Sequence, residues 1–162
     1  MDSLDEIKLE LQKIPWFRDL QIKHLDMLAG ITQVRSAKAG EVLFREGDRA
    51  EYIYIVLSGR VALDMAVPPR GKMRFHTADT WEVVGWSSAT PVVHQRTASA
   101  TTVVDSRLAM IDSAKLRELC DQDHDLGYLV MRRLSNIVAS RLMSSRLQLL
   151  DMFAEPETKN AK

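Results

Sequence analysis

Residues 52–67 read YIYIVLSGRVALDMAV, and this stretch decides the expected fold. Two runs rich in β-branched and aromatic residues, at 52–56 and 60–67, flank the turn signal Ser58-Gly59. This pattern is typical of two strands separated by a turn. Similar short runs lie outward along the chain at 42–44 (VLF), 72–76 (KMRFH), 98–104 (ASATTVV) and 107–111 (RLAMI). Because no helical pattern separates these runs, they indicate an antiparallel sandwich or roll rather than parallel βαβ units.

Helical patterns flank the β-rich region on both sides. Residues 4–14 and 22–29 carry apolar side chains at helical spacing. After the strands, Asp112 or Ser113 can cap a helix that runs to about Cys120. The sequence therefore predicts an α+β chain that is mainly β. We expect N-terminal helices at 1–30, the β-roll at 31–112, C-terminal helices at 113–153 and a frayed tail at 154–162.

Residues 125–153 contain no proline and predict a helix of about 28 residues, roughly 42 Å long. Apolar residues recur along one face of this helix at steps of three and four. This stripe contains six apolar residues and one serine: Met131, Leu134, Val138, Leu142, Ser145, Leu149 and Met152. A stripe this narrow is typical of a seam between two helices. The sequence therefore predicts a homodimer through residues 125–153, and the alternative is a helix that packs wholly onto its own domain.

The composition narrows the function classes. Of 162 residues, 46% are hydrophobic and 27% are charged, and 22 basic residues balance 22 acidic ones. Without net charge the chain has no global field that would attract nucleic acid or an anionic membrane. No run approaches the roughly 20 apolar residues that span a bilayer, and the single cysteine, Cys120, has no partner for an intrachain disulfide. We therefore expect a cytoplasmic protein that does not bind DNA directly or enter a membrane.

One segment differs from ordinary strand sequence. Residues 84–91 read VGWSSATP, and residues 96–100 read RTASA. A glycine after a strand, followed by small hydroxyl residues, allows backbone amides to approach an anion. Arg96 offers a fork of donors suited to phosphate, and Thr97 offers a hydroxyl beside it. The residues alone leave open the alternative that Arg96 is a solvated residue at the edge of a strand.

Three motifs together resemble the cyclic nucleotide-binding domain. They are residues 40–48 (GEVLFREGD), residues 52–61 (YIYIVLSGRV) and the Gly85 turn with Arg96-Thr97-Ala98. This family is the sensor module of bacterial regulators like the catabolite activator protein, and of cyclic nucleotide-gated channels and kinases. The resemblance spans about residues 15–153. It implies an eight-stranded antiparallel β-roll, or jelly roll, with short N-terminal helices and a long C-terminal helix that caps the ligand and pairs with its twin in the bacterial regulators.

The resemblance also implies a binding site for cAMP or cGMP. Its phosphate-binding cassette corresponds to residues 85–98, in which backbone amides, the Arg96 guanidinium and the Thr97 hydroxyl would face the cyclic phosphate. Similar residues on the long helix would bring Ser145 and Arg146 near the base. The ligand-binding residues expected in this way are Gly85, Trp86, Ser87, Ser88, Arg96, Thr97, Ala98, Ser145 and Arg146.

Two departures from the family pattern modify this expectation. Trp86 stands where the family's binders usually place a glutamate that accepts the ribose 2′-hydroxyl, and an indole is only a donor. Trp86 would instead stack on a base or sugar, or fill the pocket as core. The bacterial regulators also continue into a helix-turn-helix domain, whereas this sequence ends at Lys162. The expectation is a stand-alone sensor that a separate effector protein reads.

Enzymatic and metal-binding motifs are missing from the sequence. The histidines at 24, 76, 94 and 124 lie on different predicted elements without metal-ligand spacing, so neither a metal nor a cofactor is expected.

Three hypotheses about function follow from the sequence. The first is a homodimeric sensor of a cyclic nucleotide or another phosphate-bearing ligand. The second is a ligand-free dimeric interaction module whose pocket Trp86 fills, and the third, more remote, is an enzyme on a cupin-like roll.

Overall fold

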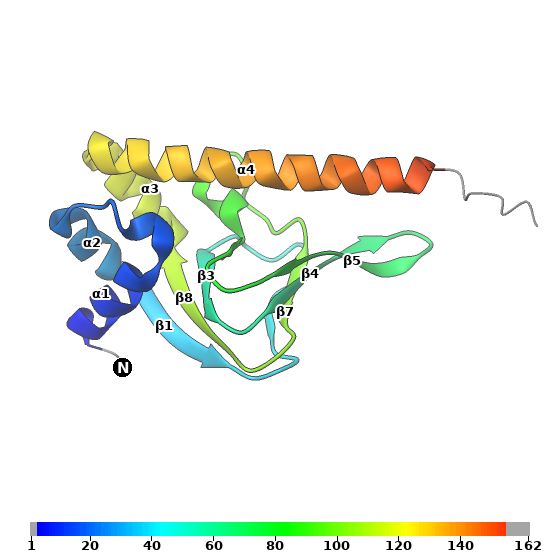
Figure 1. Ribbon diagram of the computed structural model, residues 1–162, viewed down its shortest axis with the longest axis horizontal. Helices are drawn as coiled ribbons and strands as arrows, with labels where there is room; N and C mark the ends of the chain where they lie inside the picture. Colours follow the sequence, from blue (N-terminus) through cyan, green and yellow to red (C-terminus); the bar gives the residue numbers. More distant parts are fainter. Residues whose placement is uncertain (1–2, 155–162) are drawn as a thin grey trace, which may run out of the picture.

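The computed structural model describes residues 3–154 of the chain. Eight strands form two four-stranded antiparallel sheets, with the orders β1-β8-β3-β6 and β2-β7-β4-β5 (Figure 1). The strands are β1 Thr32–Ala37, β2 Val42–Phe44, β3 Tyr52–Ser58, β4 Val61–Val67, β5 Gly71–Ala78, β6 Val83–Val84, β7 Ser99–Thr102 and β8 Ser106–Asp112. The expected eight-stranded roll is confirmed. The expected tail, apart from Ala154, lies outside the described residues.

Six of the eight strands correspond to runs visible in the sequence, and β1 and β6 do not. Strand β1, TQVRSA, mixes polar and small residues because it lies at an edge of its sheet and pairs only with β8. Strand β6 is two residues long and pairs with Tyr54 and Ile55 of β3. Neither strand therefore has enough buried side chains to produce a recognisable pattern.

Strand β3 separates two hydrophobic cores. Its residues Ile53, Ile55 and Leu57 pack toward the helices, whereas Tyr54 and Val56 point into the roll, as the two-residue repeat of a strand requires. The helix-side core contains the buried residues Ile7, Leu11, Ile14, Phe17, Leu25, Leu28, Ala29, Ile53, Ile55, Leu57, Val83, Ala89, Ala109, Ile111, Leu116 and Leu126. The roll core contains Ala37, Phe44, Tyr54, Val56, Val61, Leu63, Ala78, Val84, Ala100 and Leu108.

Short helices at the N-terminus complete the helix-side core beside β1 and β8 (Figure 1). They are α1 Leu4–Lys13, the 3-10 turn η1 Pro15–Phe17 and α2 Ile22–Ala29. Ser3 and Glu6 form a reciprocal capping box that satisfies free amides at the start of α1. The amphipathic pattern of these segments thus places their apolar faces against the sheet that contains β3.

Two helices follow the roll, α3 Ser113–Gln122 and α4 His124–Phe153. Asp112 and Asp123 cap them, because their carboxylates accept the amides of Lys115 and Leu126 at 3.0 and 2.9 Å. Helix α4 runs the length of the molecule on one side of the roll (Figure 1). Its first half packs on the helix-side core, and its apolar residues from Leu142 onward are exposed. In the part of the chain that is described, no helix is both long enough and apolar enough to cross a membrane.

Candidate ligand-binding site

The predicted cassette is a tight turn between two strands. Strand β6 leads into Gly85, whose φ of +75° lies in the left-handed region that glycine tolerates. The 3-10 turn η2, Trp86–Ala89, follows, and the chain returns through Arg96 to β7. The Arg96 amide donates to the Asp48 carbonyl, and the Gly47 amide donates to the Arg96 carbonyl, both at 2.8 Å. These two bonds fix the point at which the arginine side chain enters the roll.

The Arg96 side chain points inward. Only 4% of the residue is exposed, so Arg96 is not a solvated edge residue. Its Nη1 donates to the Gly85 carbonyl at 3.3 Å, and its Nη2 donates to the Tyr52 carbonyl. The guanidinium carbon lies 4.1 Å from the centre of the Phe44 ring and 5.9 Å from that of Tyr54, which is the geometry of a cation–π contact.

The charge of this guanidinium is incompletely compensated. No ion pair formed within residues 3–154 includes Arg96, and its Nε is buried without a hydrogen-bond partner among those residues. Burial lowers the pKa of Arg96, while electrostatic interactions with Tyr54, Asp48 and Glu51 raise it. A buried cation without a close counter-ion is unfavourable. An anion that accepted a hydrogen bond from Nε would offset that cost, because the bond would be charge-assisted.

Ser88 connects the cassette to α3. Its hydroxyl contacts the same two carbonyls as Arg96, that of Gly85 at 2.8 Å and that of Tyr52 at 3.2 Å. The Ser113 hydroxyl donates to the Ser88 hydroxyl at 2.8 Å, and Arg117 donates to the Ser88 carbonyl. Both serines are fully or almost fully buried. Arg96 and the two carbonyls that it contacts, those of Gly85 and Tyr52, are therefore joined through Ser88 to the start of α3.

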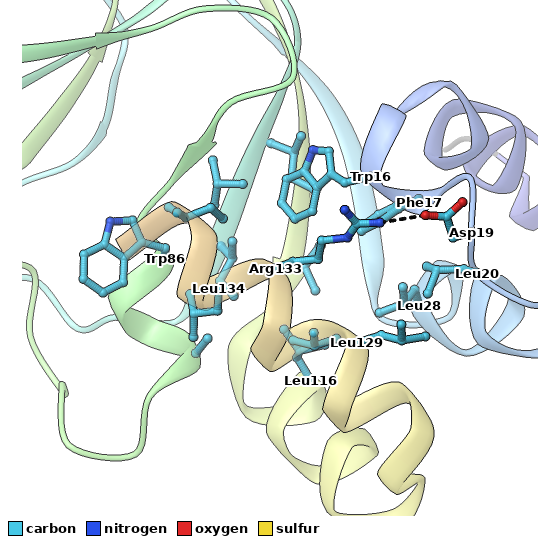
Figure 2. Close-up of a pocket in the computed structure, with 17 residues that line it drawn as sticks. Trp16, Phe17, Asp19, Leu20, Leu28, Trp86, Leu116, Leu129, Arg133 and Leu134 are labelled. Carbon is cyan, nitrogen blue, oxygen red and sulfur yellow. Dashed lines mark hydrogen bonds and ion pairs between the residues drawn. The ribbon is translucent and has the colours of Figure 1, made fainter. Parts of the chain in front are cut away.

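Trp86 lies on the other side of the cassette. The indole is half-buried, packs against the helix-side core and lines a cavity together with Leu134 and Ile137 of α4 (Figure 2). Trp86 thus lies outside the roll core that surrounds Arg96. Of the two alternatives for this residue, stacking on a ligand or filling the pocket, the structure does not show the indole filling the space around Arg96. The reason is local: Gly85 turns the chain, so the residue after it faces α4 and the helix side of β3.

The remaining predicted residues lie less centrally. Ser87 and Ala98 are half-buried, and Thr97 is exposed. Ser145 and Arg146 are exposed on the second half of α4 and take no part in the hydrogen bonds around Arg96. The structure therefore brings Gly85, Ser88 and Arg96 together, and it does not bring the two α4 residues to them.

Sequence reasoning did not identify the carbonyl of Tyr52, the ring of Phe44 or the side chains of Ser113 and Arg117 as parts of this site. The alternation of β3 and the motif around Phe44 carried a signal for the first two, because inward positions could be counted along those strands. The two α3 residues gave no signal, since their contact with Ser88 depends on how α3 packs. Within residues 3–154, no three His, Cys, Asp or Glu side chains are grouped to hold a metal ion.

Comparisons with known proteins agree with this geometry. Residues 34–123 match the sequence profile of the cyclic nucleotide-binding domain. A putative potassium channel protein of Rhodopseudomonas palustris is 27% identical over 129 residues, which cover 80% of this chain and 30% of that protein. The chain thus spans about three-tenths of the length of this curated relative.

Solved structures share the fold. A putative cyclic nucleotide-binding protein from Geobacter metallireducens GS-15 has a TM-score of 0.72 and 25% identity, over 88% of this chain and 99% of that one. The regulatory domain of Toxoplasma gondii PKA, solved with cAMP, has a TM-score of 0.67 and 13% identity, over 82% and 50% of the two chains. The profile match covers more than half of the sequence, and the chain therefore belongs to the cyclic nucleotide-binding domain family.

Proposed function

We propose that this chain is a non-catalytic sensor domain that binds a cyclic nucleotide, cAMP or cGMP, or a related phosphate-bearing ligand. The observation that carries the proposal is the buried guanidinium of Arg96, which has a free Nε and no ion-pair partner within residues 3–154. A phosphate has the charge and the acceptor oxygens that such a group lacks. The Toxoplasma gondii domain, which shares the fold, was solved with cAMP, and this supports the same ligand class here.

Ligand binding would release Arg96 from its present partners. The carbonyls of Gly85 and Tyr52 now accept from the guanidinium, and Ser88 contacts both of them. When Arg96 turns toward a phosphate, the Gly85 carbonyl keeps the Ser88 amide as a donor at 3.2 Å. The single proton of the Ser88 hydroxyl can then serve the Tyr52 carbonyl, 3.2 Å away, so each carbonyl keeps one donor. Because Ser88 also holds Ser113 and Arg117, the exchange would alter the contacts of α3 and, through it, the start of α4. A ligand shifts such an equilibrium only if it binds the two arrangements unequally.

Trp86 predicts a lower affinity than a glutamate at this position would give. An indole does not accept the ribose hydroxyl, and one lost charge-assisted bond corresponds to roughly ten- to a few hundredfold in affinity. A ligand with a phosphate and a different sugar or base would lose less. We therefore expect Arg96 to dominate ligand binding.

We propose a homodimer through α4 as the assembled form. The exposed side of this helix carries large apolar residues over several turns, among them Met131, Val138, Leu142, Leu149 and Met152, which are 37–68% exposed. They recur at intervals of three, four or seven residues, as the core positions of a two-helix seam do. Exposed apolar rows of this length are unusual on a monomer, and a change at the start of α4 would reach an effector through this pair of helices.

The alternative function is a ligand-free dimeric interaction module. It is favoured by the hydrogen bonds that Arg96 already makes to the Gly85 and Tyr52 carbonyls and by Trp86 at the glutamate position. In that case the guanidinium is a permanent structural link between β3 and the cassette, and α4 alone is the working surface.

Calorimetric titration with cAMP and cGMP distinguishes the two functions. The sensor predicts saturable binding that Arg96→Met abolishes, while Arg45→Met, which changes an exposed arginine, leaves the affinity unchanged. Circular dichroism of Arg96→Met would show that its fold is retained. Absence of binding to either nucleotide, or equal binding by Arg96→Met, would support the interaction module.

Light scattering tests the dimer separately. The wild-type chain should have twice the monomer mass at micromolar concentration, and Leu142→Glu combined with Leu149→Glu should yield monomers because two charges would face each other in the seam. A monomeric wild-type chain would refute the proposed assembly without bearing on Arg96.

A further inference from the structure

Two adjoining cavities lie between the first half of α4, η1 and the sheet that contains β3, and Figure 2 shows the inner one. The inner cavity, named here the hollow, has a volume of about 60 Å³ and walls that are almost entirely apolar. The outer cavity, named the vestibule, has a volume of about 280 Å³ and includes polar groups of Glu82, Asn136, Ser140 and Arg141. The residues that line both are Trp16, Val83, Arg133 and Ile137. The two cavities together form one amphipathic site.

The hollow favours an apolar occupant over water. Its volume of about 60 Å³ is sufficient for several water molecules, but a buried water needs two to four polar partners. The lining side chains include Leu28, Ile55, Leu116, Leu134 and Ile137, none of which offers a donor or acceptor. A short alkyl chain or the edge of an aromatic ring meets the same walls without losing hydrogen bonds.

Arg133 places a positive charge where the hollow opens into the vestibule. Its Nη2 lies 3.0 Å from Oδ2 of Asp19, and the Arg133 side chain is 26% exposed while that of Asp19 is 74% exposed (Figure 2). Ion pairs with one solvent-exposed member contribute little. A carboxylate that enters the vestibule can therefore take the place of Asp19 on Arg133, whereas Arg141 is occupied by Glu82 and the Val83 carbonyl.

All three tryptophans of the chain line this site. Trp86 lines the hollow, Trp81 the vestibule and Trp16 both. Trp81 has a φ of +72°, the only non-glycine residue of the described chain with positive φ, and its carbonyl accepts the Trp16 indole at 3.2 Å. Backbone strain at a bulky residue is typical of functional sites. Its position here supports a binding role for the vestibule.

We propose that the hollow and the vestibule form a second ligand site, for a small amphipathic monocarboxylate. The apolar chain or ring of the ligand occupies the hollow, and its carboxylate binds Arg133 in place of Asp19. This site lies on the helix side of β3 and shares no residue with the surroundings of the Arg96 guanidinium, which are Phe44, Tyr52, Tyr54, Gly85 and Ser88. Because α4 and η1 both contribute to it, an occupant would hold the first half of α4 against the N-terminal segment.

Tryptophan fluorescence of the full chain, titrated with butanoate and with butan-1-ol, tests the proposal. Butanoate should cause a saturable change. Arg133→Met should weaken butanoate by about tenfold or more and leave butanol unchanged, whereas Arg132→Met, at an exposed neighbouring position of α4, should leave both unchanged. Ala89→Val should weaken both ligands because Ala89 lines the hollow.

A gain of affinity provides a test that does not depend on a variant that loses binding. Asp19→Asn removes the competing carboxylate at an exposed position, so butanoate should bind several-fold more tightly to this variant while butanol does not. No saturable response to butanoate, equal butanoate binding by Arg133→Met, or no tightening in Asp19→Asn would overturn the proposal. None of these results depends on whether a cyclic nucleotide binds at Arg96.

Discussion

The two sides of strand β3 differ in how they use space and charge. On the roll side, aromatic residues such as Phe44 and Tyr54 close around the guanidinium of Arg96. On the helix side, apolar residues from the N-terminal helices, α3 and α4 meet but leave the hollow. The buried guanidinium thus lies in the filled core, whereas the space on the helix side is bordered by the ion pair between Arg133 and Asp19. A ligand on the roll side must displace hydrogen bonds of a buried arginine, whereas a ligand on the helix side displaces only the exposed carboxylate of Asp19.

The largest expected effect is on the alkylation rate of Cys120, which reports whether water reaches the helix-side core. The thiol packs against the helix-side core, and burial, with a further contribution from Asp121, raises its pKa to about 11. A rise of about two pH units leaves roughly a hundredfold less thiolate near pH 8. Alkylation by iodoacetamide should be slower in the folded chain than in urea by about that factor and should accelerate as the pH approaches 11. Equal rates in the two states at pH 8 would show that water reaches this core.

Matched alanine-to-valine substitutions compare the packing of the two cores directly. Ala100 in the roll core is 0% exposed, and Ala89 beside the hollow is 4% exposed. Ala100→Val should lower the free energy of unfolding by roughly 1 to 3 kcal/mol because the roll core has no room for two methyl groups. Ala89→Val should leave it unchanged or raise it, since the methyl groups enter the hollow. Urea denaturation measures both, and equal losses would contradict the difference in packing.

Much of this architecture was predictable from the sequence. The runs at 42–44, 52–56 and 60–67 alternate or stay apolar as strands do, and the cap at Asp112 coincides with the observed start of α3. The profile match over residues 34–123 supports the same reading. Patterns of this kind record burial and local hydrogen bonding, and those are the properties that define strands and helix ends.

The arrangement around the cassette was only partly predictable. The sequence indicated Arg96 and the Gly85 turn, because a donor fork and a residue that tolerates positive φ have few substitutes. The direction of Trp86 depends on a left-handed φ at Gly85, and the Ser88–Ser113 bond on the packing of α3. The hollow arises where eight elements meet, namely η1, α2, β3, β6, η2, β8, α3 and α4. Such features depend on contacts between residues distant in sequence, which no local pattern records.

Ser88 and Ser87 provide a sharper comparison within one turn. Ser88 is fully buried and bonded to the Gly85 carbonyl and to Ser113, while Ser87 is half-buried. Ser88→Ala should lower the free energy of unfolding by about 1 to 2 kcal/mol, because the Ser113 hydroxyl loses its acceptor. Ser87→Ala should change it by less than about 0.5 kcal/mol. Thermal unfolding followed by circular dichroism distinguishes these outcomes, and similar effects at both positions would show that the network to α3 contributes nothing specific.

Asp123 gives the smallest expected effect and concerns the point where α4 joins the helix side. Its carboxylate accepts the Leu126 amide at 2.9 Å and lies 3.2 Å from Nζ of Lys23, and the backbone bond, followed by Lys23, lowers its pKa to about 2. A depressed folded-state pKa means that the stabilisation is complete above the ordinary value near 3.8 and is lost as the pH falls toward 2. Asp123→Asn keeps a capping oxygen and does not titrate. The wild-type chain should therefore lose stability relative to this variant between about pH 4 and pH 2, and a carboxyl titration followed by NMR should have its midpoint near 2. A midpoint near 4 would mean that α4 starts without this cap in solution, and the first half of α4 would then be free to move away from the hollow.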